Sequence, residues 1–149
     1  MMKFLIRSAI LLLCLQALMG CAATVVLSPA DDANNPSCAK VMVRLPQDTD
    51  GLTKRSTNSQ STAAFGTPVA VTLRCGLKPI LVSALPCLTA GGVDWIVDES
   101  NKPKYTFISF GRTPATEITV DSTKASGATV LEDLGQAVQF TPVSKKCLG

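Results

Sequence analysis

The sequence contains no histidine, the side chain that proteins use most often as a general base near neutral pH and as a metal ligand. Catalytic arrangements of serine, histidine and aspartate, or of cysteine and histidine, are therefore excluded. Aromatic residues are also scarce, with one tryptophan and one tyrosine among 149 residues. The formal net charge is only +3, and the basic residues are scattered among acidic ones, so the sequence predicts no nucleic-acid partner.

The first 21 residues have the anatomy of a bacterial lipoprotein signal. Lys3 and Arg7 make the start positive, residues 9–18 are almost wholly apolar, and the small residue Gly20 precedes Cys21. These features predict a signal peptide over residues 1–20. The mature chain would begin at an acylated Cys21, which anchors it to the extracytoplasmic face of the cell membrane.

Two alternatives to lipidation stay open. A retained transmembrane helix would need roughly 20 apolar residues, whereas this apolar run is shorter and contains Gln16. A freely secreted product is the other alternative, because Met19 is less usual than alanine, serine or threonine before a Gly–Cys pair. After Cys21, residues 21–35 are expected to form a lipid-anchored tether, and residues 36–149 a single domain.

Cysteine usage predicts two disulfides. Cys14 would leave with the signal and Cys21 would carry the lipid, which leaves an even number: Cys38, Cys75, Cys87 and Cys147. These four lack C-x-x-C spacing, and an exported protein meets an oxidising environment, so we expect disulfides and predict no metal and no cofactor. Of the three connectivities we favour Cys75 with Cys87, across a short proline-containing segment, and Cys38 with Cys147, near the ends of the domain.

Hydrophobic periodicity predicts an α+β domain. A helix is expected to begin with Asn35 as N-cap and Pro36 as its first residue, and to end at Pro46. Residues near 63–65 and 69–74 form β-rich segments, and alternating apolar residues indicate antiparallel strands near 93–97, 105–110 and 115–120, whereas the polar residues 47–62 indicate a loop. A second helix is expected near 129–139. We therefore expect an antiparallel sheet of three to four strands with both helices packed on one face.

Three short blocks follow one another along the chain: Arg74-Cys75-Gly76, Gly92-Val93-Asp94-Trp95 and Gly111-Arg112-Thr113-Pro114. With them the chain resembles a family of small actinobacterial lipoproteins known only as a domain of unknown function. The resemblance extends to Leu45-Pro46, Phe65-Gly66-Thr67-Pro68 and Cys87, although Phe65 stands where the family pattern has tryptophan. It implies a cell-envelope location and supplies no catalytic residue.

Arg74, Asp94 and Arg112 are the charged residues of these blocks. Each has apolar or glycine neighbours on successive expected strands, so they are placed to converge on one face of the sheet. Two interpretations stay open: a structural ion network that fixes strand register, or a pocket whose arginines bind an anion. Trp95 is expected in the core.

The function predicted from these patterns is a non-enzymatic binding or accessory module of the envelope, whose ligand the sequence does not identify. Its expected partners are the membrane, through the lipid anchor, and another envelope protein or wall polymer. The alternative is a carboxylate-dependent enzyme acting on cell-wall glycan, because Asp94, Asp98 and Glu99 lie close together in the sequence and glycoside hydrolysis needs only two carboxylates.

Overall fold

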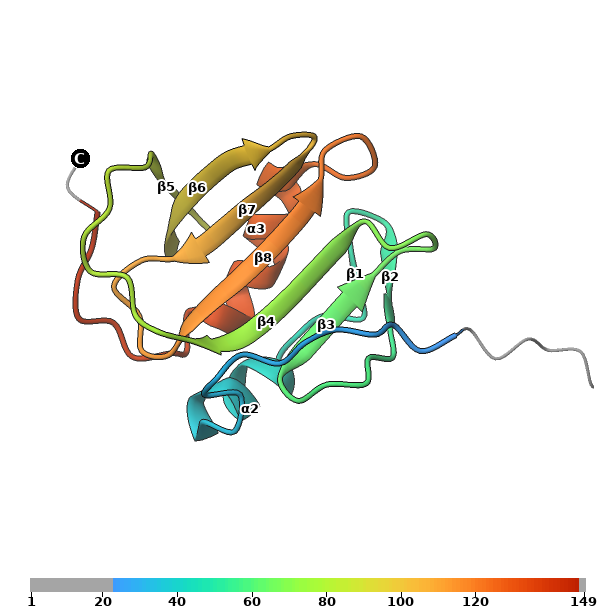
Figure 1. Ribbon diagram of the computed structural model, residues 1–149, viewed down its shortest axis with the longest axis horizontal. Coiled ribbons are helices and arrows are strands. Elements are labelled where there is room, and N and C mark those ends of the chain that lie inside the picture. The colour runs from blue at the N-terminus through green and yellow to red at the C-terminus, as the bar shows by residue number, and fades with distance from the viewer. Residues whose placement is uncertain (1–22, 148–149) are drawn as a thin grey trace, which may run out of the picture.

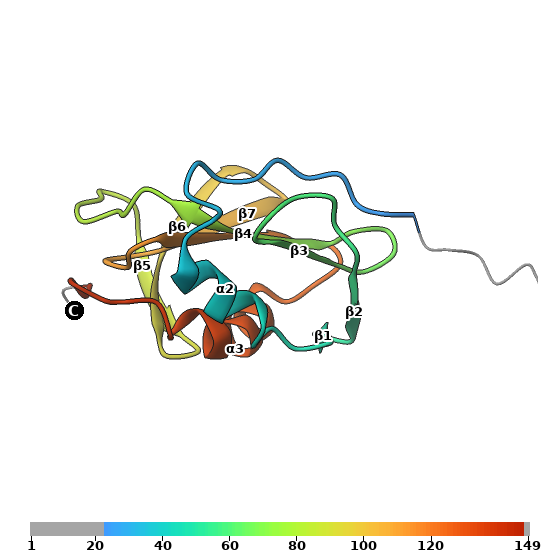
Figure 2. The same ribbon diagram turned by 90° about the horizontal axis from the view of Figure 1, so that it is seen from below.

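A computed structural model describes residues 23–147 of the chain. The predicted signal peptide and the predicted lipidation site at Cys21 lie outside these residues. The described part forms one antiparallel sheet of eight strands, and two helices lie on one face of it (Figures 1 and 2). No helix among the described residues is long and apolar enough to span a bilayer.

The helices are α2 (Pro36–Met42) and α3 (Gly127–Val138). The strands are β1 (Asp48–Thr49), β2 (Leu52–Arg55), β3 (Thr62–Phe65), β4 (Val71–Leu77), β5 (Cys87–Ala90), β6 (Val93–Asn101), β7 (Lys104–Ser109) and β8 (Ala115–Asp121). Their spatial order is β1-β2-β3-β4-β8-β7-β6-β5.

This order divides the sheet into two meanders of four strands each. The first half, residues 23–77, contains β1 to β4 and α2, and the second half, residues 87–147, contains β5 to β8 and α3. Residues 78–86, which we call the crossing segment, carry the chain from β4 to the far edge of the sheet. Strand β8 then returns to the centre and pairs with β4, from Val71 opposite Val120 to Leu77 opposite Ala115.

The prediction of three to four strands is wrong, because the sheet has eight. Strands β1 and β2 lie within the predicted loop 47–62, and they are two and four residues long. Strand β5 is almost wholly exposed, so it has no alternation of buried and exposed residues. These short edge strands are specified by pairing with a neighbour, and their own sequence patterns carry little signal.

Local signals located both helices. The side-chain oxygen of Asn35 accepts a hydrogen bond from the Ser37 amide at 2.9 Å, which confirms the predicted N-cap of α2. Helix α2 ends at Met42, before the predicted stop at Pro46. At α3, the Ser126 hydroxyl accepts a hydrogen bond from the Thr129 amide at 3.3 Å.

The hydrophobic core lies between the helices and the sheet face that they cover (Figure 2). Its largest fully buried side chains include Trp95, Phe65, Leu73, Ile118, Leu131 and Leu134. The indole nitrogen of Trp95 donates a hydrogen bond to the Ala90 carbonyl at 3.0 Å, so its one polar atom is satisfied. The predicted core position of Trp95 is confirmed.

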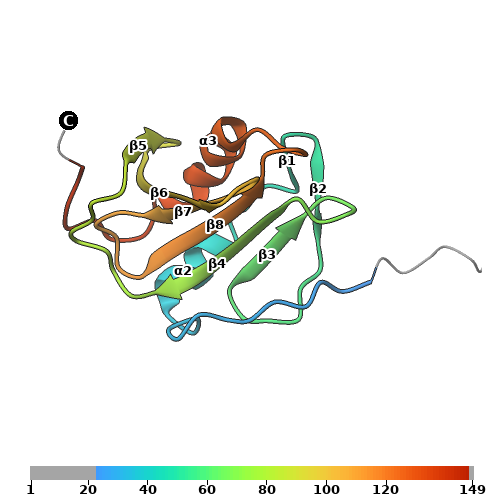
Figure 3. The same cartoon turned by 45° about the horizontal axis from the view of Figure 1, so that its top comes forward.

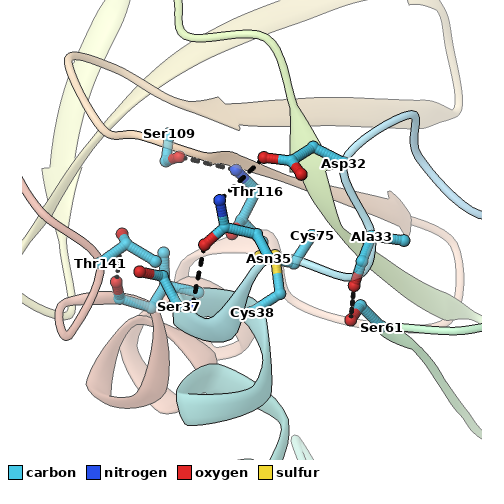
Figure 4. Close-up of a disulfide and its surroundings, with 11 residues drawn as sticks. Asp32, Ala33, Asn35, Ser37, Cys38, Ser61, Cys75, Ser109, Thr116 and Thr141 are labelled. Atoms are coloured by element: carbon cyan, nitrogen blue, oxygen red, sulfur yellow. Dashed lines mark hydrogen bonds between the residues drawn. A yellow bond between two sulfur atoms is a disulfide. The ribbon is translucent and has the colours of Figure 1, made fainter.

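All four described cysteines form disulfides, but the favoured pairing is wrong. Cys38 pairs with Cys75, with their Cα atoms 5.5 Å apart, and Cys87 pairs with Cys147, with their Cα atoms 6.4 Å apart. Cys75 lies on the central strand β4, next to α2 (Figure 4), whereas Cys87 begins the edge strand β5 (Figure 1). The crossing segment between them spans the end of the sheet and does not turn back on itself.

Candidate functional site

The sheet face opposite the helices carries a row of side chains that leads into a surface groove. Directly opposed residues of antiparallel strands share a face, so the strand registers define one continuous row across six strands. The row consists of Thr62, Arg74, Glu117, Ile108, Ile96 and Cys87. It is polar in the first half and at β8, and it becomes apolar toward β5.

The apolar end of this row lies in a groove with a volume of about 390 Å³, which we call the distal groove. It is lined by Leu81, Val82, Ser83, Leu85, Cys87, Ile96, Phe110, Lys145, Lys146 and Cys147. The crossing segment supplies one wall. The C-terminal segment of residues 141–147, which we call the tail, supplies the other. Figures 1 and 3 show both segments at the same end of the sheet.

Gly111 joins the two walls of the distal groove. Its amide donates a hydrogen bond to the Ile80 carbonyl at 2.8 Å, and its carbonyl accepts one from the Ser144 amide at 2.8 Å. Gly111 has a φ of 65°, and a Cβ at this position would overlap the carbonyl oxygen of Lys145. Only glycine therefore allows the tail to pass this close to the turn.

Arg112, the next residue, fixes the start of the tail. Its guanidinium is buried and donates hydrogen bonds to the carbonyls of Gln139 at 2.9 Å, Thr141 at 2.6 Å and Gly92 at 3.2 Å. Two of these carbonyls follow α3, where the negative end of the helix dipole favours a cation. Burial lowers the pKa of Arg112, and the nearby charge of Asp94 opposes that shift.

Asp94 holds the other end of the tail. One carboxylate oxygen accepts a hydrogen bond from the Cys147 amide at 2.9 Å, and the other accepts one from the Thr89 hydroxyl at 2.6 Å. The disulfide between Cys147 and Cys87 fastens the same point covalently to β5. Asp94 and Arg112 thus act on one structural element, although the described contacts include no ion pair between them.

Arg74, the third charged residue of the predicted network, lies elsewhere. It pairs with Glu117 directly across the β4–β8 junction, with Nε 2.7 Å from Oε1 and Nη2 3.2 Å from Oε2. The hydrogen bond that Arg74 donates to Glu117 is the main cause that raises the pKa of Arg74. The structure therefore does not unite Arg74, Asp94 and Arg112 in one network.

Two of the three carboxylates considered for catalysis, Asp98 and Glu99, are in the hairpin formed by β6 and β7, away from Asp94. Asp98 accepts a hydrogen bond from the Ser100 amide at 2.9 Å, and this bond lowers the pKa of its carboxyl group. Glu99 pairs with Lys102 at 2.6 Å. Among residues 23–147 there is no cluster of three or more acidic or cysteine side chains with the geometry of a metal site.

Sequence reasoning did not find the distal groove, although a signal for it was present. Four of the exposed large hydrophobic side chains, Leu81, Val82, Leu85 and Val143, lie in the crossing segment and the tail. An apolar run between Pro79 and Pro86, outside any strand, could have indicated a contact surface. The turn at Gly111 brings this run beside Lys145 and Lys146. The residues of the run itself do not indicate that neighbour.

Comparison with known families tests the resemblance to a domain of unknown function that the sequence blocks indicated. The family model described as "Protein of unknown function (DUF3515)" matches residues 11–146. The chain belongs to the DUF3515 family. The match covers every residue that lines the distal groove except Cys147, together with the blocks around Arg74, Asp94 and Arg112, so nearly the whole site is part of the DUF3515 domain. No curated protein and no solved structure matches the chain.

Membership of DUF3515 confirms the predicted relationship to a domain of unknown function. It assigns no ligand and no catalytic residue to the chain. The actinobacterial origin and the lipidation that the resemblance implied stay predictions.

Proposed function

We propose that this DUF3515 protein is a binding module of the cell envelope, anchored by an acylated Cys21, and that the distal groove is its binding surface. The observation that carries the proposal is the groove itself, about 390 Å³ in volume, with apolar side chains of the crossing segment and the sheet on one side and two lysines on the other. Its volume lies within the range of ligand sites. Its two walls come from separate segments that Gly111 and Cys147 hold in place.

The position of the described N-terminus supports an envelope location with the groove available to a ligand. The described chain begins two residues after Cys21, and its first segment lies at the opposite end of the molecule from the tail and the crossing segment (Figure 1). An anchor at Cys21 would therefore leave the distal groove pointing away from the bilayer. The two disulfides add support, because such bonds form and persist in oxidising compartments outside the cytoplasm.

The alternative function, hydrolysis of wall glycan, would need two carboxylates facing each other across a cleft. The described surface includes four grooves of comparable size: the distal groove, two grooves beside Arg74, and one beside Tyr105. None of the four is lined by two carboxylates. We therefore favour binding over catalysis.

Anchoring is tested by Cys21→Ala, with Cys14→Ala as the matched control inside the predicted signal. Metabolic labelling with a fatty acid and fractionation of cells are the measurements. We expect Cys21→Ala to lose the acyl label and leave the membrane fraction, whereas Cys14→Ala keeps both properties. Retention of the label and of membrane association by Cys21→Ala would contradict the anchoring proposal.

Use of the distal groove is tested by photo-crosslinking in intact cells. A benzophenone amino acid replaces Val82, which is 83% exposed at the groove, or Val43, which is 79% exposed after α2. We expect a discrete adduct from position 82 and none from position 43. If position 82 gives no adduct, or both positions give the same adducts, the groove is not the binding surface.

A further inference from the structure

We propose that the distal groove binds a single-chain anionic amphiphile, a long-chain carboxylate, with its acyl chain on the apolar floor and its carboxylate at Lys145 and Lys146. This inference rests on the function proposed above and names the class of ligand. It follows from the polarity, the charge and the size of the groove.

The floor and one wall of the groove offer an apolar path. Ile96 and Phe110 form the floor and are nearly buried, at 3% and 7% exposure. Leu81 and Leu85 rise from the crossing segment and are about half exposed. A hydrocarbon chain laid along this path would rest on the buried floor and cover Leu81 and Leu85, which otherwise face water.

The other wall carries positive charge alone. Among residues 23–147, Lys145 and Lys146 are the only charged ones that line the groove. The ion pairs within this range involve other side chains. Asp94, beneath the tail, already accepts hydrogen bonds from Thr89 and the Cys147 amide. The two lysines complement an anionic head group at the end of the apolar path.

The size of the groove favours a small ligand. At about 390 Å³ it is near the lower limit for ligand sites, which suits one acyl chain better than the two chains of a phospholipid. The lipid expected on Cys21 is not the occupant, because the first described segment lies at the opposite end of the molecule (Figure 1). The occupant is therefore a separate molecule.

The test uses exported protein carrying Cys21→Ala, which needs no detergent, and the fluorescent carboxylate 11-(dansylamino)undecanoate as probe. We expect saturable binding with a blue shift of the dansyl emission. Laurate should displace the probe at least tenfold more effectively than dodecanol, and dodecyltrimethylammonium should not displace it. Within the series octanoate, decanoate and laurate, each added methylene should strengthen competition by up to about fourfold, as expected for burial of a methylene group.

Matched variants locate the site. Lys145→Ala/Lys146→Ala should weaken probe binding at least tenfold, whereas Lys40→Ala/Lys104→Ala, which removes two exposed lysines elsewhere, should change it less than twofold. Val82→Asp should weaken binding, and Val43→Asp should not. Thermal unfolding of each variant separates a lost site from a lost fold, and the comparison of laurate with dodecanol needs no variant at all.

Three results would overturn the proposal: no saturable probe binding, equal displacement by the carboxylate and the quaternary amine, or an equal effect of the two lysine pairs. Its failure can be distinguished from failure of the proposed function. If position 82 crosslinks to a protein in cells while laurate does not bind, the groove is a binding surface but its ligand is not an amphiphile. If neither occurs, both proposals fail.

Discussion

The two halves of the sheet each contain one disulfide, and the two bonds have different surroundings. In the first half, Cys38 and Cys75 are fully buried and join α2 to β4 within the core (Figure 4). In the second half, Cys87 is exposed and Cys147 is half-buried, and their bond fixes the tail to the edge strand β5. The first disulfide thus supports core packing, whereas the second shapes a surface groove.

The largest effect is expected from removal of the buried disulfide. Cys38→Ala/Cys75→Ala should lower the free energy of unfolding by about 5 kcal/mol, of which about 4 kcal/mol is loop entropy and the rest the cavity left in the core. The loop entropy refers to a sequence separation of 37 residues. Urea unfolding of the exported protein measures the change.

The matched variant Cys87→Ala/Cys147→Ala sharpens the comparison. Its loop-entropy loss is also about 4 kcal/mol at most, for a separation of 60 residues, but little core packing is lost. It should release the tail and weaken binding of the dansyl probe, whereas the folded fraction of the buried-disulfide variant should bind normally. Equal loss of binding in both variants would contradict the division of roles.

The next effect concerns the buried cation of the second half. Arg112→Ala should destabilise the protein by about 3 kcal/mol, because it leaves three carbonyls, of Gln139, Thr141 and Gly92, without their donor. Thermal and urea unfolding measure the loss. Asp94→Ala is the companion variant, and it should loosen the tail with a smaller loss of stability. A change below about 0.5 kcal/mol for Arg112→Ala would mean that the guanidinium does not hold the tail.

A smaller effect is expected at the turn between the groove walls. Gly111→Ala should cost about 2 kcal/mol and reduce probe binding, because its Cβ would displace the tail at Lys145. Gly51→Ala is the matched control, since Gly51 has a similar φ of 73° but no atom within 4 Å of the added Cβ. The control should cost about 1 kcal/mol and leave binding unchanged. Equal losses in both variants would rule out the steric role of Gly111.

The smallest effect is expected at the junction of the halves. Arg74 and Glu117 pair across β4 and β8, but their side chains are 39% and 18% exposed, so solvent screens the interaction. A double-mutant cycle with Arg74→Ala and Glu117→Ala should give a coupling energy of about 0.5 to 1 kcal/mol. The coupling should decrease at high salt. A coupling above 2 kcal/mol would show that this pair, and not strand pairing alone, holds the halves together.

The parts of the fold that could be predicted are those with local signals. Asn35 and Pro36 start α2 as expected, and the alternation of Val71 and Leu73 with polar neighbours identified β4. The short strands β1, β2 and β5 were missed because their positions depend on neighbours already in the sheet. The residues of these three strands do not specify their pairing by themselves. The pairing becomes defined only when the neighbouring strands are in place.

The candidate site was harder to predict, because its walls are far apart in the sequence. The sequence predicts that Asp94 and Arg112 share an ion network or an anion pocket, whereas in the structure both contact the tail and form no ion pair with each other. Arg74 was grouped with them because all three have similar neighbours in the sequence. Its actual partner, Glu117, lies 43 residues away and is brought opposite it by the β4–β8 register.

Neither disulfide crosses from one half of the sheet to the other. Cys38–Cys75 closes a ring within the first half, Cys87–Cys147 closes a ring within the second, and the crossing segment is the single covalent link between the two rings. One proteolytic cut beside Val82 would therefore convert the chain into a non-covalent heterodimer, joined by β4–β8 pairing and the contact between α2 and α3. The two fragments would separate in denaturant without any reductant, so each half can be prepared as an oxidised piece and tested for reassembly with the other.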